Sequence, residues 1–265
     1  MNVLITGAAG GLGRAFAVEC AKRGYNLLLT DINEAGLLSI REGLERRYGA
    51  RVYVMPLDIT EGAELEKLFR FAQDIGFRLD MLVNVAGGDA EGAFLERDGA
   101  AITRVVRLNV VAALDATHRA LEARNPDIPF HVVFVSSLAS MYPMPYKAAY
   151  AASKRFLLDF SLALRQELLE RNVTVTTLCP AGLATTRQAM TGMAVQGFMG
   201  SATANSIELI TKRTIDKALR GRFLYIPGAL NKILYAVSRF IPRPLIARLI
   251  HARWGSARER KVCAE

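Results

Sequence analysis

A tyrosine and a lysine four residues apart are the pair in this sequence whose types and spacing could do acid–base chemistry. Tyr150 and Lys154 stand at the start of a segment with helical spacing, so both side chains would lie on one helix face. A phenol loses its proton only at about pH 10, and a neighbouring ammonium lowers that pKa. Tyr150 could then exchange a proton with a hydroxyl or carbonyl oxygen, and Ser137, just upstream, could hydrogen-bond the same oxygen.

A glycine-rich turn near the N-terminus could hold a phosphate-containing ligand. Residues 6–13 read Thr-Gly-Ala-Ala-Gly-Gly-Leu-Gly and lie between a first apolar run and a first helical segment. Glycines let the backbone approach a pyrophosphate, and a helix N-terminus supplies free N–H groups. This strand–turn–helix context favours a dinucleotide site over an ordinary turn. The expected contacts are Gly7, Gly11, Leu12 and Gly13.

Two acidic residues follow the next strand-like runs and could select the dinucleotide. Asp31 ends the second run, where a carboxylate can accept hydrogen bonds from both ribose hydroxyls and would repel a 2′-phosphate. The sequence therefore favours NAD over NADP. The alternative is that Asp31 caps the helix that begins near Glu34. Asp58 and Ile59 follow the third run and would lie near the adenine, although this segment also resembles a helix entry.

The elements that must position these residues alternate along the chain between buried strands and amphipathic helices. Strands are expected at residues 3–6, 26–31, 51–56, 81–84, 130–136, 173–178 and 223–226. Helices are expected at residues 12–23, 34–48, 63–75, 102–124 and 150–171. Repeated βα units predict an α/β fold, a doubly wound, Rossmann-like parallel sheet of seven strands with helices on both faces, in a single domain.

Composition and charge exclude several other classes of protein. Hydrophobic residues make up 51% of the 265 residues, which excludes a disordered chain. Three scattered cysteines and three lone histidines indicate neither a disulfide framework nor a metal site. The N-terminus lacks the features of a secretory signal, so we expect a cytoplasmic protein. From Lys212 onward there are 13 basic and 3 acidic residues, which accounts for the whole net charge of +9 and disfavours a nucleic-acid partner.

Taken together, these motifs resemble the short-chain dehydrogenases/reductases, in their compact, non-extended branch. The resemblance is carried by the glycine pattern, an Asn-Asn-Ala-Gly-like motif, a helix asparagine and the Ser, Tyr and Lys residues. The matching positions are Thr6, Gly7, Gly11, Gly13, Asn84, Ala86, Gly87, Asn109, Ser137, Tyr150 and Lys154. Val85 departs from the motif at its second Asn, and Ala181 stands where the family usually has Gly after Pro180.

The resemblance implies an NAD(P)-dependent oxidoreductase that moves a hydride between nicotinamide and a carbonyl or secondary alcohol carbon. It implies that Tyr150 is the general acid/base, that Lys154 lowers its pKa and binds the ribose, and that Ser137 polarises the carbonyl. Asn109 would hold a water of a proton relay, or be a helix-kink residue, or both. Asn84, Ala86 and Gly87 would line the adenosine half of the cofactor. The loop that would grip the nicotinamide contains Pro180, Gly182, Leu183 and Thr185. The resemblance also implies a homodimer or homotetramer.

Three segments should form the walls of the substrate pocket, at residues 88–94, 138–146 and 187–201. They are rich in methionine and aromatic side chains, which suits a small but bulky apolar molecule such as a steroid, a fatty-acyl derivative or a terpenoid. A lid or a subunit contact packed by ordinary apolar residues is the alternative. The candidate substrate contacts are Leu138, Met144, Tyr146, Met190 and Met193.

The C-terminal part of the chain is read as an extension of the catalytic domain. Residues 1–228 would form that domain, with a lid insertion at about 187–211, and residues 229–265 a basic amphipathic extension. Two short helices are expected there, on either side of Pro242-Arg243-Pro244, followed by a solvated tail at 258–261. Three interpretations stay open for 229–254: peripheral contact with an anionic membrane, an oligomer interface, or a cover over the pocket.

Two further functions compete with NAD-dependent oxidation and reduction of a lipophilic substrate. One is an NADP-dependent reductase of the 3-oxoacyl type in lipid metabolism, which would use NADP despite Asp31. The other is a non-catalytic, nucleotide-sensing protein on the same fold, because fold alone does not determine function. The complete set of Asn109, Ser137, Tyr150 and Lys154 disfavours the sensor, which has no need of all four.

Overall fold

The computed structural model describes residues 1–182 and 206–262, with side chains through residue 252. Its strands form one parallel sheet in the order β3-β2-β1-β4-β5-β6-β7. The strands are β1 (Asn2–Thr6), β2 (Asn26–Asp31), β3 (Val52–Pro56), β4 (Met81–Asn84), β5 (Phe130–Val135), β6 (Val173–Leu178) and β7 (Leu224–Tyr225). The expected seven-stranded, doubly wound sheet is confirmed, with strand ends that differ by one residue at most.

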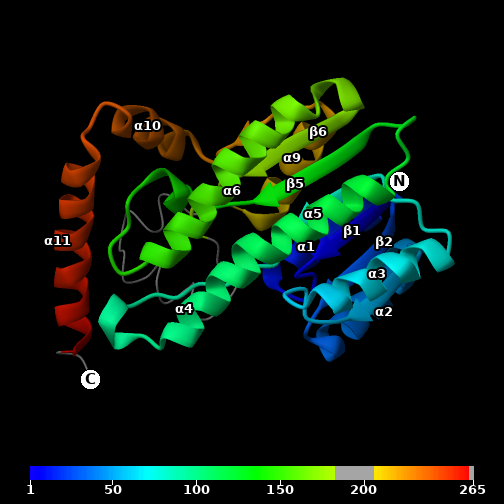
Figure 1. Ribbon diagram of the computed structural model, residues 1–265, viewed down its shortest axis with the longest axis horizontal. Coiled ribbons are helices and arrows are strands. Elements are labelled where there is room, and N and C mark those ends of the chain that lie inside the picture. Colours follow the sequence, from blue (N-terminus) through cyan, green and yellow to red (C-terminus); the bar gives the residue numbers. More distant parts are fainter. Residues whose placement is uncertain (183–205, 263–265) are drawn as a thin grey trace.

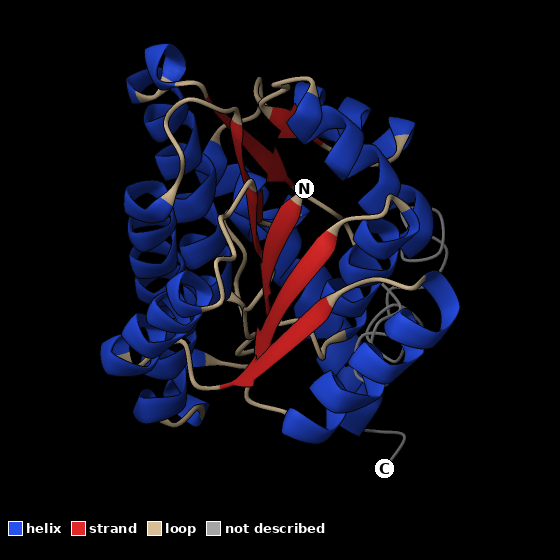
Figure 2. Ribbon diagram, turned by 90° about the vertical axis from the view of Figure 1, so that its right-hand side faces the viewer, coloured by secondary structure: helices blue, strands red, loops and turns tan. Residues whose placement is uncertain are grey.

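Helices cover both faces of this sheet, as Figure 2 shows. The α-helices are α1 (Gly11–Lys22), α2 (Glu34–Tyr48), α3 (Gly62–Asp74), α4 (Gly99–Val106), α5 (Ala112–Ala123), α6 (Ala148–Glu167), α9 (Ile207–Leu219), α10 (Ala229–Ser238) and α11 (Arg243–Val262). Short 3-10 turns are η1 (Phe94–Glu96), η3 (Leu138–Met141) and η4 (Leu169–Arg171), and η2 (Arg107–Val111) is a π-turn. Helix α11 continues through residues 258–261, where a tail was expected, so that prediction is wrong for the backbone.

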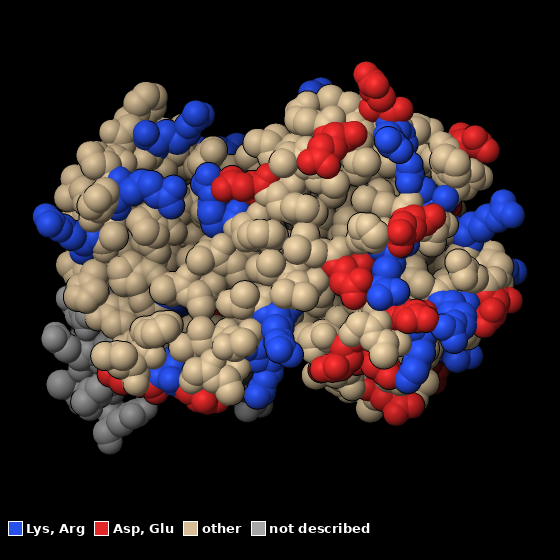
Figure 3. Space-filling view, in the orientation of Figure 1, with Lys and Arg blue, Asp and Glu red and all other residues tan. Residues whose placement is uncertain are grey.

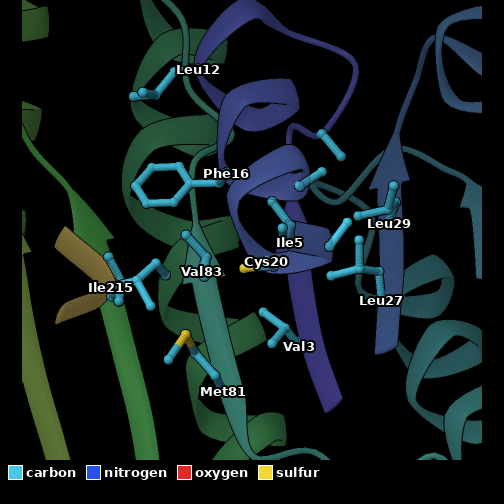
Figure 4. Packing of buried hydrophobic residues seen from close by; sticks show 14 of the residues in the cluster. Val3, Ile5, Leu12, Phe16, Cys20, Leu27, Leu29, Met81, Val83 and Ile215 are labelled. Carbon is cyan, nitrogen blue, oxygen red and sulfur yellow. The ribbon is translucent and has the colours of Figure 1, made fainter. Parts of the chain in front are cut away.

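The core is divided in two by the sheet because alternate residues of each strand point to opposite faces. Val3 and Ile5 of β1 pack with α1, α2 and α9, whereas Leu4 packs with α3, α5 and α6. Figure 4 shows the first of these layers, in which Phe16 and Cys20 of α1 lie over the strands. Near-continuous burial on both sides explains why these strands are almost entirely apolar in sequence.

The strand order creates a crevice between β1 and β4. β1 pairs with β2 on one side and with β4 on the other, so the chain reverses its winding direction at this point. Loops that leave the carboxyl ends of two such strands diverge toward opposite faces of the sheet, and ligands of open α/β sheets bind there. The glycine-rich turn follows β1, and the Val85–Gly88 segment follows β4, so both expected cofactor segments border the crevice.

One expected helix, residues 102–124, proves to be three consecutive pieces: α4, the π-turn η2 and α5. The π-turn contains Asn109, which is fully buried. The Asn109 side chain forms hydrogen bonds with the loop after β4 and with α6, as described below. A wide turn of this kind commonly marks a functional position in a helix.

Candidate functional site

The glycine-rich turn is shaped so tightly that two of its glycines have no room for a side chain. Gly7 has a φ of 67°, and a Cβ there would lie 2.6 Å from the Ala86 Cα. A Cβ on Gly13 would lie 2.1 Å from the Gly7 carbonyl oxygen. The first turn of α1 leaves N–H groups with no acceptor inside the helix, and Gly10 and Gly11 before them are exposed. This arrangement fits a pyrophosphate, which would bind the free N–H groups.

Changing Gly13 to Ala is expected to abolish dinucleotide binding and to lower the melting temperature, because the added methyl overlaps backbone atoms. The measurement is cofactor titration by fluorescence together with thermal unfolding. Gly43→Ala is the matched control, since nothing lies within 4 Å of the added Cβ in the interior of α2. That control should gain about 0.5–1 kcal/mol of stability. Normal cofactor binding by Gly13→Ala would contradict the assignment of the turn.

Asp31 lies at the end of β2 and contacts the glycine-rich turn directly. Its Oδ2 accepts a hydrogen bond from the Ala9 N–H at 3.0 Å, and its Oδ1 accepts one from the Asn33 N–H at 3.0 Å. The cap of α2 is instead Asn33, whose side chain accepts from the Gly36 N–H. The alternative of Asp31 as helix cap is therefore not what the structure shows. The carboxylate stands where it could meet a ribose beside the turn.

The segment after β4 forms the other wall of the crevice. The Thr6 hydroxyl accepts hydrogen bonds from the Val85 and Ala86 N–H groups at 3.2 and 3.3 Å, which ties this wall to β1. Gly87 is exposed toward the crevice. The Asn84 side chain is buried and donates to the Thr117 hydroxyl at 3.0 Å, so it would contribute to a cofactor site only through its backbone.

The remaining expected cofactor residues lie at the same edge of the sheet with their side chains turned inward or capped. Leu12 and Ile59 are buried in the core, and Asp58 Oδ1 accepts from the Thr60 N–H and hydroxyl, which is the helix-entry role. The carbonyl of buried Pro180 accepts from the Leu138 N–H at 2.8 Å, and Gly182, two residues later, is exposed. Four expected site residues lie outside the described part of the chain: Leu183, Thr185, Met190 and Met193.

Ser137 and Tyr150 come together beyond the end of β5. Ser137 caps the η3 turn, where its Oγ accepts from the Ala139 N–H at 3.1 Å, and its side chain is close enough to the Tyr150 hydroxyl to lower the pKa of that phenol. Helix α6, which carries Tyr150 in its first turn, packs against η3. Two hydroxyls of different elements thus lie side by side where one substrate oxygen could contact both.

Burial raises the pKa of Tyr150 above its usual range, and the hydrogen bond from Ser137 opposes that rise. The phenol is therefore protonated at neutral pH in the protein alone. Lys147, whose Nζ lies 5.6 Å from the Tyr150 ring centroid, also lowers the Tyr150 pKa. Lys154, which the sequence favours for this effect, lies 5.9 Å from the same ring centroid, and its influence on the Tyr150 pKa stays a prediction.

Lys154 is buried and directed toward the backbone of β5. Its Nζ donates to the Val135 carbonyl at 3.0 Å and lies 5.9 Å from the Tyr150 ring centroid. Burial lowers the pKa of Lys154 to about 8. Burial of the charged ammonium is therefore unfavourable for folding. Such perturbed groups are typical of ligand-binding and catalytic sites.

Asn109 joins the crevice wall to α6 from within its π-turn. Its Oδ1 accepts from the Gly88 N–H at 2.8 Å, and its Nδ2 donates to the Gly88 carbonyl at 3.0 Å and to the Ser153 hydroxyl at 2.9 Å. A Cβ on Gly87 would lie 3.0 Å from both Asn109 Oδ1 and Lys154 Nζ. The helix-kink interpretation of Asn109 therefore has a structural basis, and the amide also lies next to the lysine.

A small hollow between the loop after β4 and the start of α6 lies in the region expected to bind substrate. Its walls are mostly apolar, with one arginine, and are formed by Ala90, Gly92, Phe94, Arg97, Ile102, Tyr146, Ala148 and Ala149. Tyr146 has an unusual φ of 65° and accepts the Gly92 N–H on its carbonyl at 2.7 Å. Of the other expected substrate residues, Leu138 packs on the small core cluster of Met141 and Ile226, and Met144 is half-buried.

Two features of the site were missed by sequence reasoning. Lys147 forms ion pairs with Asp89 at 2.5 Å and Glu91 at 2.9 Å, joining the start of α6 to the loop after β4. His251 of α11 stacks on Tyr146, with ring centroids 5.4 Å apart, and its Nε2 lies 3.1 Å from the Tyr146 hydroxyl. Neither pairing has a signal in the sequence, because the partners are far apart in the chain and surface charges and a lone histidine are common.

Comparison with known proteins agrees with this geometry. Residues 1–194 match the family model of the short chain dehydrogenases. The chain is 27% identical to the ketoacyl reductase HetN of Nostoc sp., over 91% of this chain and 85% of that protein. It is 32% identical to a diacetyl reductase of Staphylococcus epidermidis, over 68% of this chain and 70% of that protein. The fold superimposes with a TM-score of 0.80 on a short chain dehydrogenase/reductase from Burkholderia phymatum solved in complex with NAD, at 22% identity and covering 90% and 92% of the two chains.

The chain therefore belongs to the short-chain dehydrogenase/reductase family. Its class is that of nicotinamide-dependent oxidoreductases acting on CH–OH and C=O groups.

Proposed function

We propose that this chain interconverts a lipophilic ketone and the corresponding secondary alcohol with NAD as its cofactor. The observation that carries the proposal is the pairing of the Ser137 and Tyr150 hydroxyls beside a crevice bordered by the glycine-rich turn and Lys154. Proximity of two proton-bearing groups and a cofactor cradle is what carbonyl reduction requires of a protein.

Each residue of the pair has a distinct task in this proposal. When bound, a nicotinamide dinucleotide would supply the hydride for reduction and accept it in the reverse reaction. The Ser137 hydroxyl orients the substrate oxygen, and Tyr150 donates its proton to that oxygen, for which its raised pKa keeps it protonated at neutral pH. Lys154 holds the ribose, and Asn109 supports the lysine side of the crevice through its bonds to Gly88 and Ser153.

The preference for NAD is supported by Asp31. Its carboxylate lies against the glycine-rich turn, where a 2′-phosphate would meet a like charge. Asp31→Asn keeps an acceptor for the Ala9 N–H and removes the charge. We expect this variant to shift the ratio of kcat/KM for NAD over NADP by about tenfold or more toward NADP. An unchanged ratio, measured with one substrate and both cofactors, would contradict the role of Asp31.

An apolar substrate is supported by the hollow and its rim. Most of the lining residues are apolar, and Phe94 of the lining and its sequence neighbour Leu95 in η1 are 66% and 96% exposed, which suits contact with a hydrophobic ligand. The named relatives act on substrates as different as ketoacyl groups and diacetyl, so the support comes from the hollow. The NADP-dependent 3-oxoacyl-type reductase is the second candidate, which the ketoacyl reductase HetN favours.

The proposal is tested by following nicotinamide absorbance with NAD or NADP and a panel of secondary alcohols from hydroxysteroids to polyols. Turnover with NAD and a bulky apolar alcohol is the expected result. Turnover restricted to polyols or sugars would overturn the lipophilic substrate, and turnover of 3-hydroxyacyl compounds with NADP alone would favour the second candidate. NADH binding without turnover across the panel and the acyl compounds would favour a nucleotide-sensing protein.

A homodimer or homotetramer is also part of the proposed function. Val111 at the end of the π-turn and Phe156 and Leu162 of α6 are exposed apolar side chains on two elements that pack together, which favours burial against a second copy. A peripheral contact with anionic membrane is proposed as well, and it is developed below.

A further inference from the structure

The last two helices carry large apolar side chains on their outer surface. Leu230, Ile233, Val237 and Phe240 recur at intervals of three and four residues, so they share one side of α10 and the turn that follows it. Leu245 and Leu249 lie one turn apart on α11. We call these six residues the C-terminal apolar face. All six are exposed among the described residues, and Phe240 is 89% exposed.

The charges around this face are all of one sign. Lys232, Arg239, Arg243 and Arg248 are exposed on the same two helices, and the sequence holds no Asp or Glu between Asp216 and Glu259. In Figure 3 the surface over α10 and the adjoining part of α11, at the upper left, shows Lys and Arg among uncharged side chains and no acidic side chain. The charge excess of the C-terminal part thus surrounds an apolar surface.

On α10 the side opposite the apolar face packs on the domain, whereas on α11 the buried Ile246 lies beside Leu245 and Leu249. Asn231 is buried and donates to the Pro227 carbonyl at 2.8 Å, and Ile246 is buried on α11. Helix α11 lies at the end of the molecule opposite α2 and α3 (Figure 1). Both helices are therefore attached to the domain and still expose the side chains of the C-terminal apolar face.

From these observations we infer that α10 and α11 dock the protein onto the surface of an anionic phospholipid bilayer. Helices that lie in the bilayer interface place apolar side chains among the acyl chains and Lys and Arg near the headgroups. No helix of the described residues is long and apolar enough to cross a bilayer, so the contact is peripheral. A second copy of the chain fits less well, because a two-fold contact through this face would set basic side chains against each other.

The docking surface is linked to the candidate site through α11. His251 stacks on Tyr146, which lines the hollow at the start of α6. A lipophilic substrate dissolved in the bilayer would then have a short path to the hollow. This last step rests on the proposed function, whereas the docking itself does not.

The test is flotation of the full-length protein, without cofactor or substrate, on vesicles of phosphatidylcholine alone or with one third phosphatidylglycerol. We expect the protein to float with the anionic vesicles and to remain below with the neutral ones. High salt should reduce flotation, because it screens the headgroup charge. Absence of flotation on anionic vesicles would overturn the inference.

Matched variants separate docking from nonspecific adhesion. Val237→Ser/Phe240→Ser is expected to lose flotation, whereas Leu38→Ser/Leu169→Ser, which changes exposed leucines elsewhere, should keep it. Each basic residue near an anionic surface strengthens binding about fivefold. Arg239→Gln/Arg243→Gln/Arg248→Gln should therefore bind about a hundredfold more weakly. Lys22→Gln/Arg51→Gln/Arg78→Gln, with exposed basic residues distant from these helices, should bind normally.

The oligomeric state of the same variants, measured by light scattering, tests whether a second copy of the chain covers the C-terminal apolar face instead. If Val237→Ser/Phe240→Ser dissociates an oligomer and leaves flotation intact, the face is a subunit contact and the inference is wrong. If the protein does not float but fully turns over a detergent-solubilised alcohol, the docking inference is wrong and the proposed function still holds. Flotation without turnover on any alcohol would support the docking alone.

Discussion

Replacing Tyr150 by Phe is expected to lower kcat for carbonyl reduction by at least about a hundredfold, because the proton donor next to the substrate oxygen is removed. The change deletes one oxygen atom and keeps the ring, so packing in the first turn of α6 is preserved. NADH affinity should be nearly unchanged, since the glycine-rich turn, Asp31 and Lys154 are intact. Steady-state kinetics and quenching of protein fluorescence by NADH measure the two quantities separately.

A matched control distinguishes loss of the proton donor from loss of any tyrosine hydroxyl. Tyr53→Phe makes the same change in β3, where the ring packs edge-on against Phe71 and Phe77. It should leave kcat and NADH affinity as they are. Substantial turnover by Tyr150→Phe would refute the acid/base role, and a parallel loss of NADH binding would show that the variant is misfolded at the crevice.

Replacing Lys154 by Met should abolish activity and at the same time stabilise the protein. The pKa of Lys154 falls from 10.5 to about 8 because the side chain is buried, so keeping it charged at neutral pH costs about 3 kcal/mol. Methionine is similar in length and carries no charge. The variant also loses the hydrogen bond from Lys154 Nζ to the Val135 carbonyl, which reduces the gain in stability by about 1 kcal/mol. A melting temperature higher by about 5 °C is the expected outcome of thermal unfolding.

The stabilisation should depend on pH in a defined direction. Between about pH 8 and pH 10.5 the unfolded chain binds this proton more often than the folded chain, so the wild type becomes more stable as pH rises. The advantage of Lys154→Met is thus full at neutral pH and is lost before the pH reaches 10.5. A constant difference across this range would show that packing, and not the buried charge, is responsible.

Lys147→Met, at the N-cap of the same helix, should change stability in the opposite direction. Although burial disfavours its charge, the carboxylates of Asp89 and Glu91 raise the pKa of Lys147. Its removal leaves these two carboxylates facing each other, so the melting temperature should fall. Stabilisation by this variant as well would mean that any loss of charge near the crevice stabilises the fold.

Most of the fold could be predicted from the sequence, because parallel strands buried on both faces are long apolar runs and the helices between them keep a regular spacing. The edge at which the site lies followed from strand polarity, since Gly7, Asp31 and Ser137 each lie at or just beyond the carboxyl end of a strand. Family membership, the seven strands and the doubly wound order are confirmed. The roles of the individual site residues stay predictions.

What the sequence could not give is the direction of side chains and the meeting of distant segments. A spacing of four residues places Tyr150 and Lys154 on one helix face, yet the lysine extends toward Val135 and the ammonium of Lys147 lies nearer the phenol ring. The stacking of His251 on Tyr146 joins residues more than a hundred positions apart. Such contacts depend on tertiary packing, which leaves no periodic pattern in the chain.

The π-turn at Arg107–Val111 allows one stripe of mostly apolar residues to pack against two different sets of elements. In an uninterrupted helix Val105, Asn109, Ala113, Ala116 and Ala120 would all fall on one side. One extra residue in a turn rotates everything after it by about 100°. The piece before the turn packs on α6, and the piece after it packs on α3 and β4. The stripe that the sequence places on one side of a helix therefore points in two directions in the folded protein. The change of direction occurs at Asn109, the residue that contacts the crevice wall.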